Sequence, residues 1–163
     1  MNNVVSINFV QDIDFQSCNN LIKLVEKLPS NSTLRININS LGGTVSAGIA
    51  MYNYLKSKEI TVWTHNLGDV QSAAILLYLA GTKRTAEAIS KFVIHPIKLN
   101  NVTNCTFHEA EELLETLKAD IQNYASVVKK ECPKIIDIDD YLTIRSQVFF
   151  PDQAQVLGVI SKD

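Results

Sequence analysis

Residues 34–49 read LRININSLGGTVSAGI, and this stretch contains the change from strand to helix that decides the fold. In its first half, aliphatic residues alternate with polar ones, which is the period of a half-buried strand. The pair Gly42-Gly43 then predicts a turn, and apolar residues from Val45 onward recur at helical spacing. The stretch therefore predicts a strand, a glycine turn and a helix in immediate succession.

The same alternation of strands and helices extends along the rest of the chain. We expect strands at 4–10, 34–39, 60–64, 92–94 and 158–161, and helices at 15–28, 45–55, 72–80, 110–128 and 151–157. Gly68 is expected to break the chain before the apolar helix at 72–80. Repeated strand–helix units are typical of a mostly parallel sheet that is covered by helices. Functional sites in such sheets lie at the carboxyl ends of strands, which here means the loops at 40–44, 68–72 and 95–96.

Length and composition limit the class of protein. The 163 residues, of which 46% are hydrophobic, predict one globular domain with its own core. The formal net charge is -2 and no basic stripe occurs, which argues against a nucleic-acid partner. No apolar run is long enough to span a membrane, and Met1-Asn2-Asn3 lacks the features of a signal peptide, so we expect a cytoplasmic protein. The three cysteines form no C-x-x-C motif, so we expect no disulfide framework and no zinc site.

Two of the predicted turns carry residues that suit acyl-transfer chemistry. Gly42-Gly43 lets backbone N–H groups approach a ligand closely, as an oxyanion hole requires, although a simple tight loop explains the pair equally well. Ser72 begins an apolar helix among small residues, which leaves room for a substrate carbonyl. The start of that helix also favours the negative charge of a tetrahedral intermediate. The alternative is that Ser72 only caps the helix, which is the commoner role of serine at this position.

Three histidines compete for the role of base to such a serine, because the ordinary pKa of histidine lies near neutral pH. His95 comes directly after the apolar strand at 92–94 and precedes Pro96. His65 also follows a predicted strand, and His108 lies near a helix start, where a solvated histidine is common. Taken singly, each of the three has a structural role more often than a catalytic one.

Taken together, these segments resemble the Clp protease proteolytic-subunit (ClpP) family. Residues 38–48 (INSLGGTVSAG) are similar to the family's Ile-Asn-Ser-Pro-Gly-Gly followed by x-x-x-Ala-Gly, with Leu41 in place of the proline. Residues 68–74 (GDVQSAA) fit Gly-x-x-x-Ser followed by small residues, and residues 92–96 (FVIHP) resemble the strand that ends in the family's catalytic histidine. The resemblance covers essentially the whole chain, so residues 1–163 are interpreted as a single ClpP-like peptidase domain.

The resemblance implies the α/β ClpP/crotonase-like superhelix of repeated β-β-α and βα units. It also implies a serine endopeptidase that acts on unfolded proteins or short peptides without a cofactor. Ser72 would be the nucleophile, and His95 would be the general base that takes its proton. The backbone N–H groups of Gly43 and Ala73 would form the oxyanion hole. The substrate would lie as an extended strand along residues 43–45.

The third catalytic residue of the family is an aspartate shortly before the closing helix, and here this chain departs from the pattern. Counting back without gaps from Gly158 puts that position at Leu142, which carries no charge. Asp140 lies just upstream, next to Asp139, and is our candidate for the third member. Ser146 or Gln147 could replace it only as neutral groups. Loss of the acid from such a triad can lower turnover roughly ten-thousand-fold.

The resemblance also implies an assembly. Members of the family form a homo-oligomeric ring, usually a double ring, in which the helix at 110–129 would contribute to the contact between rings, and an AAA+ unfoldase is a candidate partner. An ordinary exposed amphipathic helix explains the same sequence pattern. Three rival functions stay open: a ClpP-like ring subunit that does not cut, an acyl-CoA enzyme of the crotonase type, and a serine–lysine peptidase that uses Lys91 or Lys83.

Overall fold

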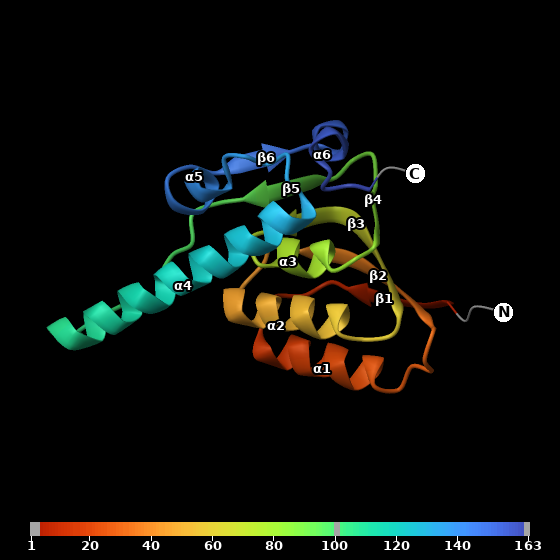
Figure 1. Cartoon of the computed structure of the whole chain (residues 1–163), viewed down its shortest axis with the longest axis horizontal. Coiled ribbons are helices and arrows are strands. Elements are labelled where there is room, and N and C mark those ends of the chain that lie inside the picture. The colour runs from red at the N-terminus through yellow and green to blue at the C-terminus, as the bar shows by residue number, and fades with distance from the viewer. Residues whose placement is uncertain (1–3, 100–101, 162–163) are drawn as a thin grey trace.

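The structure, a computed structural model, describes residues 4–99 and 102–161 and is drawn in Figure 1. Its elements, in chain order, are β1 (Val4–Phe9), α1 (Phe15–Val25), β2 (Thr33–Ser40), α2 (Val45–Lys56), β3 (Thr61–Gln71), α3 (Ala74–Leu79), β4 (Lys83–Ala86), β5 (Lys91–Ile94), α4 (Phe107–Glu131), α5 (Ile138–Thr143), β6 (Gln147–Phe149) and α6 (Pro151–Leu157). The first three strands are each followed by a helix, as the sequence predicts.

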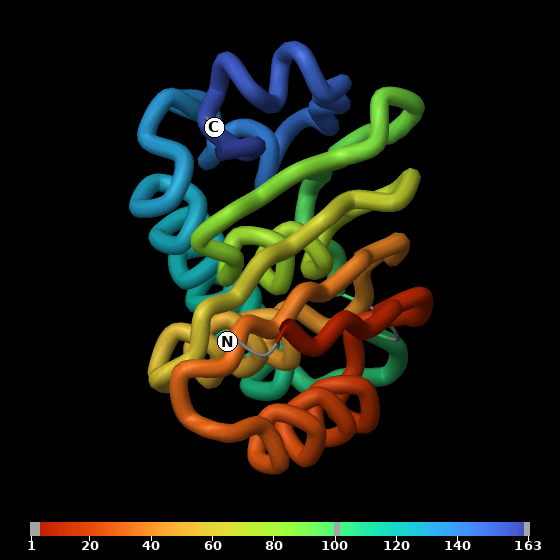
Figure 2. The backbone as a smooth tube through the Cα atoms, turned by 90° about the vertical axis from the view of Figure 1, so that its right-hand side faces the viewer, coloured from red at the N-terminus to blue at the C-terminus, as the bar shows by residue number. Residues whose placement is uncertain are grey.

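The strands join one six-stranded sheet, and Figure 2 shows how they lie side by side. Strands β1, β2 and β3 pair in parallel, in that order. The long β3 then divides its pairing: residues 63–66 pair with β4, and residues 69–71 pair with β5, both in parallel. Strand β6 runs antiparallel to β5. This topology confirms the prediction of a mixed α/β fold with a mostly parallel sheet.

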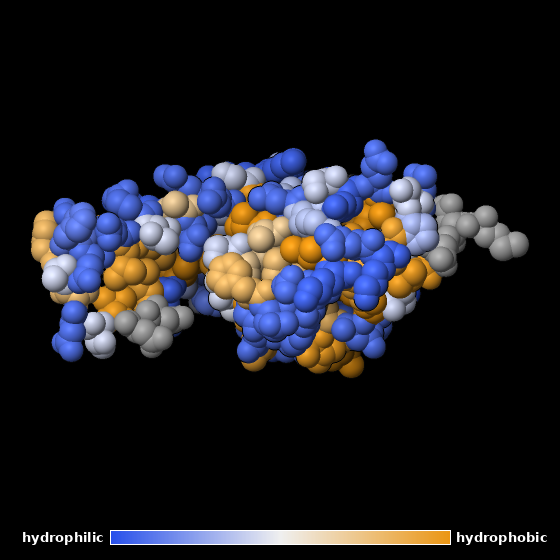
Figure 3. Space-filling model, turned by 90° about the horizontal axis from the view of Figure 1, so that it is seen from below, coloured by the Kyte–Doolittle hydropathy of each residue, from blue (hydrophilic) through white to orange (hydrophobic). Residues whose placement is uncertain are grey.

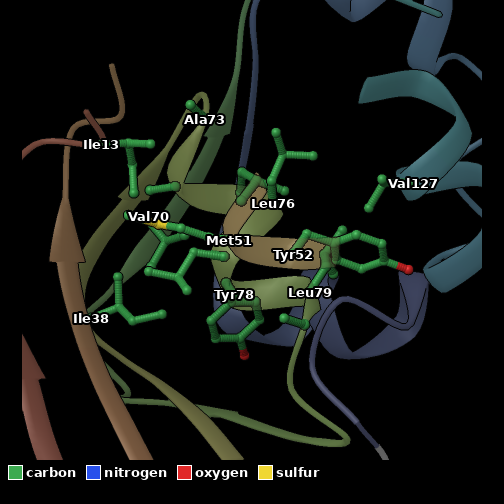
Figure 4. Packing of buried hydrophobic residues seen from close by; sticks show 14 of the residues in the cluster. Ile13, Ile38, Met51, Tyr52, Val70, Ala73, Leu76, Tyr78, Leu79 and Val127 are labelled. Atoms are coloured by element: carbon green, nitrogen blue, oxygen red, sulfur yellow. The ribbon is translucent and has the colours of Figure 1, made fainter. Parts of the chain in front are cut away.

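The core lies between the sheet and the helices α1, α2 and α3. Because side chains alternate across a strand, β2 turns Leu34, Ile36 and Ile38 to the same side, and all three are fully buried. Helix α3 is apolar on every face, as a helix surrounded by protein must be, and each of its six residues is buried. Figure 4 shows Ile38 of β2 and Leu76 of α3 in the same packed cluster. Helix α3 is therefore held from all sides, which fixes the position of the turn that precedes it.

Helix α4 is the longest element, and its first half projects from the body in Figure 1. A capping box between Thr106 and Glu109 supports its exposed start. The buried residues of α4 come from its second half and are Tyr124, Ala125, Val127 and Val128. On the projecting part, apolar side chains such as Phe107 and Leu114 are exposed among polar ones (Figure 3). No described helix, α4 included, is both long enough and apolar enough to cross a membrane.

Several details correct the sequence-based expectation. Gly68 does not break the chain, because β3 continues through it to Gln71 and the Asn66 side chain accepts a hydrogen bond from the Gly68 N–H at 2.9 Å. Residues 158–161 form no strand: Gly158 has a φ of 81° and ends α6, and the residues after it turn. The sequence analysis did not expect β4, α5 or β6. Each of them is too short to produce a readable periodic pattern.

Candidate active site

Ser72 occupies the sharp turn that joins β3 to α3. Its φ is 50°, in the left-handed region that a residue with a side chain rarely adopts. Three hydrogen bonds hold its backbone there: its N–H donates to the Val93 carbonyl at 2.8 Å, and its carbonyl accepts from Ile75 N at 3.0 Å and from the Tyr124 hydroxyl at 2.8 Å. Strained residues of this kind persist where surrounding contacts determine them, and they concentrate at functional sites.

The alternative that Ser72 serves as a helix cap is wrong. Helix α3 begins at Ala74, its N-cap residue is Ala73, and no side chain caps it. The Ser72 hydroxyl makes no hydrogen bond to any other described residue, and the side chain is partly exposed. The hydroxyl is therefore available to a bound molecule.

Gly42 and Gly43 pack closely against this turn, and the space there admits no side chain. Gly42 and Gly43 have φ values of 100° and 142°. A Cβ atom on Gly42 would lie 2.6 Å from the Ser72 Cβ, and one on Gly43 would lie 2.2 Å from the carbonyl oxygen of Ile13. Hydrogen bonds on either side, from Ile13 N to Gly42 O at 2.8 Å and from Thr44 N to Ile13 O at 2.7 Å, hold the loop in place. The loop thus lies within van der Waals distance of Ser72.

Two backbone N–H groups at this junction have no acceptor among the described residues. They belong to Gly43 and Ala73, the two residues that the resemblance assigns to the oxyanion hole. An N–H group without an internal partner can donate to a bound oxygen, and such donors stabilise negative charge on it.

His95 follows β5 directly, and its ring is held by the adjacent backbone. The Nδ1 atom lies 2.9 Å from the Pro96 carbonyl oxygen. Since a carbonyl oxygen can only accept, Nδ1 carries the proton in this contact and Nε2 is left as the basic nitrogen. The backbone thus selects the tautomer that a general base needs.

The other candidate bases lie elsewhere. His65 is inside β3, where its two ring nitrogens contact Thr85 Oγ1 at 2.7 Å and Glu87 Oε1 at 3.0 Å. His108 is exposed on α4, 3.3 Å from a glutamate of the next turn.

Lys91 forms an ion pair with a carboxylate oxygen of β3 at 3.1 Å, and Lys83 lies over a tryptophan ring. Neither lysine lines the cleft that contains Ser72, so the geometry does not favour a serine–lysine pair.

Ser72 and His95 share a cleft of about 380 Å³. Its walls come from the glycine loop, the start of α2, the segment after β5 and the middle of α4; the lining residues are Leu41, Gly43, Thr44, Val45, Ser72, His95, Ile97, Lys98 and Asp120. Two hollows of about 450 and 860 Å³ lie along the first half of α4, but neither contains both a serine and a histidine. The cleft beside Ser72 is therefore the candidate active site.

The acid expected behind His95 is not among its contacts. Leu142 is buried, and its carbonyl accepts a hydrogen bond from Ile97 N at 3.0 Å, so this position lies next to the segment after β5 without supplying a charge. The Asp140 carboxylate is on the surface, 3.9 Å from Arg145, and no ion pair with His95 exists among the described residues. Asp140 as a third member stays a prediction.

The β5–β6 ladder ends next to His95 without giving the ring a partner. Its last pair is Ile94 with Gln147, and Ser146 is an exposed residue just before β6. No hydrogen bond joins Ser146 to His95 among the described residues. Ser146 as a neutral substitute for the acid therefore stays a prediction.

The sequence analysis missed two further residues of the cleft, Lys98 and Asp120. Asp120 belongs to α4, and burial raises the pKa of its carboxyl group. The sequence spacing could have indicated the position of Asp120. This residue lies four residues before the buried Tyr124 and therefore on the face of the helix that is turned inward. A carboxylate on that face is unusual enough to be noticed.

The fold and this cleft together define an α/β protein in which a serine at a strained turn and a histidine line the same cleft. The model of the Clp protease family matches residues 1–162, and the chain belongs to that family. The identity with known members is modest. The ATP-dependent Clp protease proteolytic subunit of Cyanophora paradoxa is 34% identical over 94 residues, which cover 55% of this chain and 48% of that protein.

Two other relatives carry similar names. The ATP-dependent Clp protease proteolytic subunit of Bdellovibrio bacteriovorus is 34% identical over 91 residues, which cover 51% of this chain and 42% of that protein. The ATP-dependent Clp protease proteolytic subunit 2 of Treponema denticola is 29% identical over 146 residues, which cover 85% of this chain and 70% of that protein. The chain thus spans about half the length of the first two relatives and a larger share of the third.

Proposed function

We propose that this chain is a serine peptidase with Ser72 as its nucleophile and His95 as its general base. One observation carries the proposal: Ser72, on a backbone held at a φ of 50°, lines the same cleft as His95. Membership of the Clp protease family supports the class of reaction. The residue assignments rest on the geometry and on the sequence motifs.

The proposed reaction uses these groups in turn. The Ser72 hydroxyl oxygen attacks the peptide carbonyl while His95 Nε2 takes its proton. The oxyanion accepts hydrogen bonds from the N–H groups of Gly43 and Ala73, each worth roughly 3 kcal/mol of barrier. The imidazolium then gives the proton to the leaving amine, and a water molecule that His95 deprotonates releases the acyl group from Ser72.

The group that accepts the hydrogen bond from His95 Nδ1–H affects the turnover of the proposed peptidase. The Pro96 carbonyl orients the ring and fixes its tautomer, but a neutral oxygen stabilises the imidazolium less than a carboxylate does. We therefore expect slower turnover than a complete triad supports. Asp140 could improve the rate only if α5 moved so that its carboxylate left Arg145 and approached the ring.

The substrate and the partners are proposed from the resemblance. An extended peptide would lie beside residues 43–45, where pairing with the backbone depends little on sequence, so unfolded proteins and short peptides are the expected substrates. The chain would work in a homo-oligomeric ring, usually a double ring, with the projecting half of α4 in the contact between rings. An AAA+ unfoldase is the expected partner for folded substrates.

The first test is labelling of the purified protein with a fluorophosphonate, which reacts with activated serines. We expect the wild-type protein to be labelled and Ser72→Ala to be unlabelled. Ser46→Ala is the matched control, because Ser46 is exposed on α2 nearby but does not line the cleft. Labelling that persists in Ser72→Ala would overturn the nucleophile assignment, and an unlabelled wild-type oligomer would favour a ring subunit that does not cut.

A further inference from the structure

The cleft contains a charged group that the proposed mechanism does not use. Asp120 comes from α4, and the Tyr124 hydroxyl one turn further along this helix donates to the Ser72 carbonyl oxygen at 2.8 Å. Residues four apart lie on the same face of a helix. Asp120 is therefore on the face of α4 that is turned to Ser72, in agreement with its place in the wall of the cleft.

Unlike several other acidic residues of α4, Asp120 has no partner for its carboxylate among the described residues. Glu109 is bonded within the capping box, Glu115 pairs with Lys118 at 2.8 Å, and Glu131 contacts two cations at the end of the helix. No ion pair or hydrogen bond to the Asp120 side chain exists within the described residues. Burial raises the pKa of its carboxyl group, which is the effect of desolvation without compensation.

We propose that Asp120 makes the cleft select peptides that carry a lysine or arginine side chain next to the scissile bond. The inference rests on the proposed peptidase function. A bound cation would give the partly desolvated carboxylate the partner it lacks, and the gain is larger than on an open surface because water is displaced from both groups. Arginine is favoured over lysine where a carboxylate can accept two parallel hydrogen bonds.

Lys98 also lines the cleft, from the segment after β5, and does not cancel this charge. Its side chain is exposed, whereas that of Asp120 is partly buried, and the two do not come within ion-pair distance. An exposed ammonium group stays hydrated and contributes little on its own. The group with the most to gain from a substrate is therefore Asp120.

The test uses peptides that differ only in one residue beside the scissile bond, which is arginine, leucine or glutamate, placed in turn on either side of the bond. We expect wild-type kcat/KM to be about tenfold higher for the arginine peptide than for the leucine peptide in one of the two series, a ratio that corresponds to about 1.4 kcal/mol. Asp120→Asn should bring this ratio close to one. Glu111→Gln, which removes the same charge from an exposed position on α4, should keep the wild-type ratio.

A binding measurement separates this inference from the proposed catalysis. The same arginine and leucine peptides, carrying a fluorophore, are titrated with the Ser72→Ala protein, with and without Asp120→Asn, and anisotropy is recorded. Tighter binding of the arginine peptide that disappears with Asp120→Asn supports the inference, even if the wild-type protein cuts nothing and the peptidase proposal fails. Equal affinities for both peptides, or an arginine preference that survives Asp120→Asn, would overturn it.

Discussion

Two groups of polar side chains in this molecule are arranged in opposite ways. Below the end of α4, Glu131 accepts a hydrogen bond from the Tyr52 hydroxyl at 2.7 Å and pairs with Lys56 at 3.0 Å and with Arg84 at 3.4 Å. The Arg84 guanidinium also donates to three backbone carbonyls between α3 and the chain end. Every charge in this Glu131 network is paired.

In the cleft beside Ser72, several polar groups have no partner. Among the described residues, Asp120 and Lys98 form no ion pair, and the Gly43 and Ala73 N–H groups have no acceptor. Unsatisfied polar groups weaken a fold, so a protein keeps them where a ligand can complete them. The Glu131 network therefore stabilises this protein, whereas the unpaired groups of the cleft reduce stability and are available to a ligand.

The strongest test of the comparison is Glu131→Gln, which keeps the shape of the side chain and removes its charge. We expect the free energy of unfolding to fall by about 2 to 3 kcal/mol, because Lys56 and Arg84 would lose their counterion in a partly buried place. Denaturant unfolding followed by circular dichroism measures the change. Glu111→Gln serves as the control and should be neutral; an equal loss in both variants would contradict the distinction.

The pH dependence of stability adds a second test of the same residue. Burial works to raise the pKa of Glu131, but hydrogen bonds from Tyr52 and Lys56, with the charges of Lys56 and Arg84, outweigh it and lower the pKa below the ordinary 4.5. A lowered pKa means that the charged group stabilises the fold above pH 4.5 and that this contribution is lost as the pH falls through the lower folded value. The difference in stability between wild type and Glu131→Gln should therefore shrink on acidification. A constant difference down to that range would show that the charge is not its source.

A smaller change, in kcat, is expected when a negative charge is added near His95. Ser146→Asp would add a carboxylate one residue before the Gln147–Ile94 pair, which is the last pair of the β5–β6 ladder and adjoins His95 in the chain. We expect kcat for a peptide substrate to rise about tenfold, since an acid stabilises the imidazolium that forms during the reaction. Asp140→Asn is the comparison variant and should change kcat little. A steep fall with Asp140→Asn would instead identify Asp140 as the acid in solution.

The smallest predicted change is a gain in the free energy of unfolding on Asp120→Asn, opposite in sign to the loss expected for Glu131→Gln. Because burial raises the pKa of Asp120, its charged form is disfavoured in the folded protein, so the charge opposes folding at neutral pH. Asp120→Asn should raise the free energy of unfolding by about 0.3 kcal/mol, a small value because water screens the partly exposed group. Chemical unfolding at neutral pH measures the change, and a clear loss of stability would show that Asp120 has a structural partner.

The sequence allowed most of the fold to be predicted because its long elements carry strong periodic patterns. The alternation in β2 and the helical spacing in α4 are examples, and both elements occur where they are expected. The prediction failed at Gly68 because a hydrogen-bonded strand can continue through a glycine when a side chain such as that of Asn66 supports it. It failed at β6 because three residues show no period.

By itself, the sequence determined the class of fold, the turn at Ser72 and the histidine after β5, because each of these depends on local pattern and on short motifs. Only the tertiary structure decided which polar groups are paired and which are free. Asp120 and Glu131 are both acidic residues of α4, and nothing in the local sequence separates their roles. One faces Tyr52, Lys56 and Arg84, and the other faces an open cleft. Their difference arises from contacts between residues far apart in the chain, which no local pattern encodes.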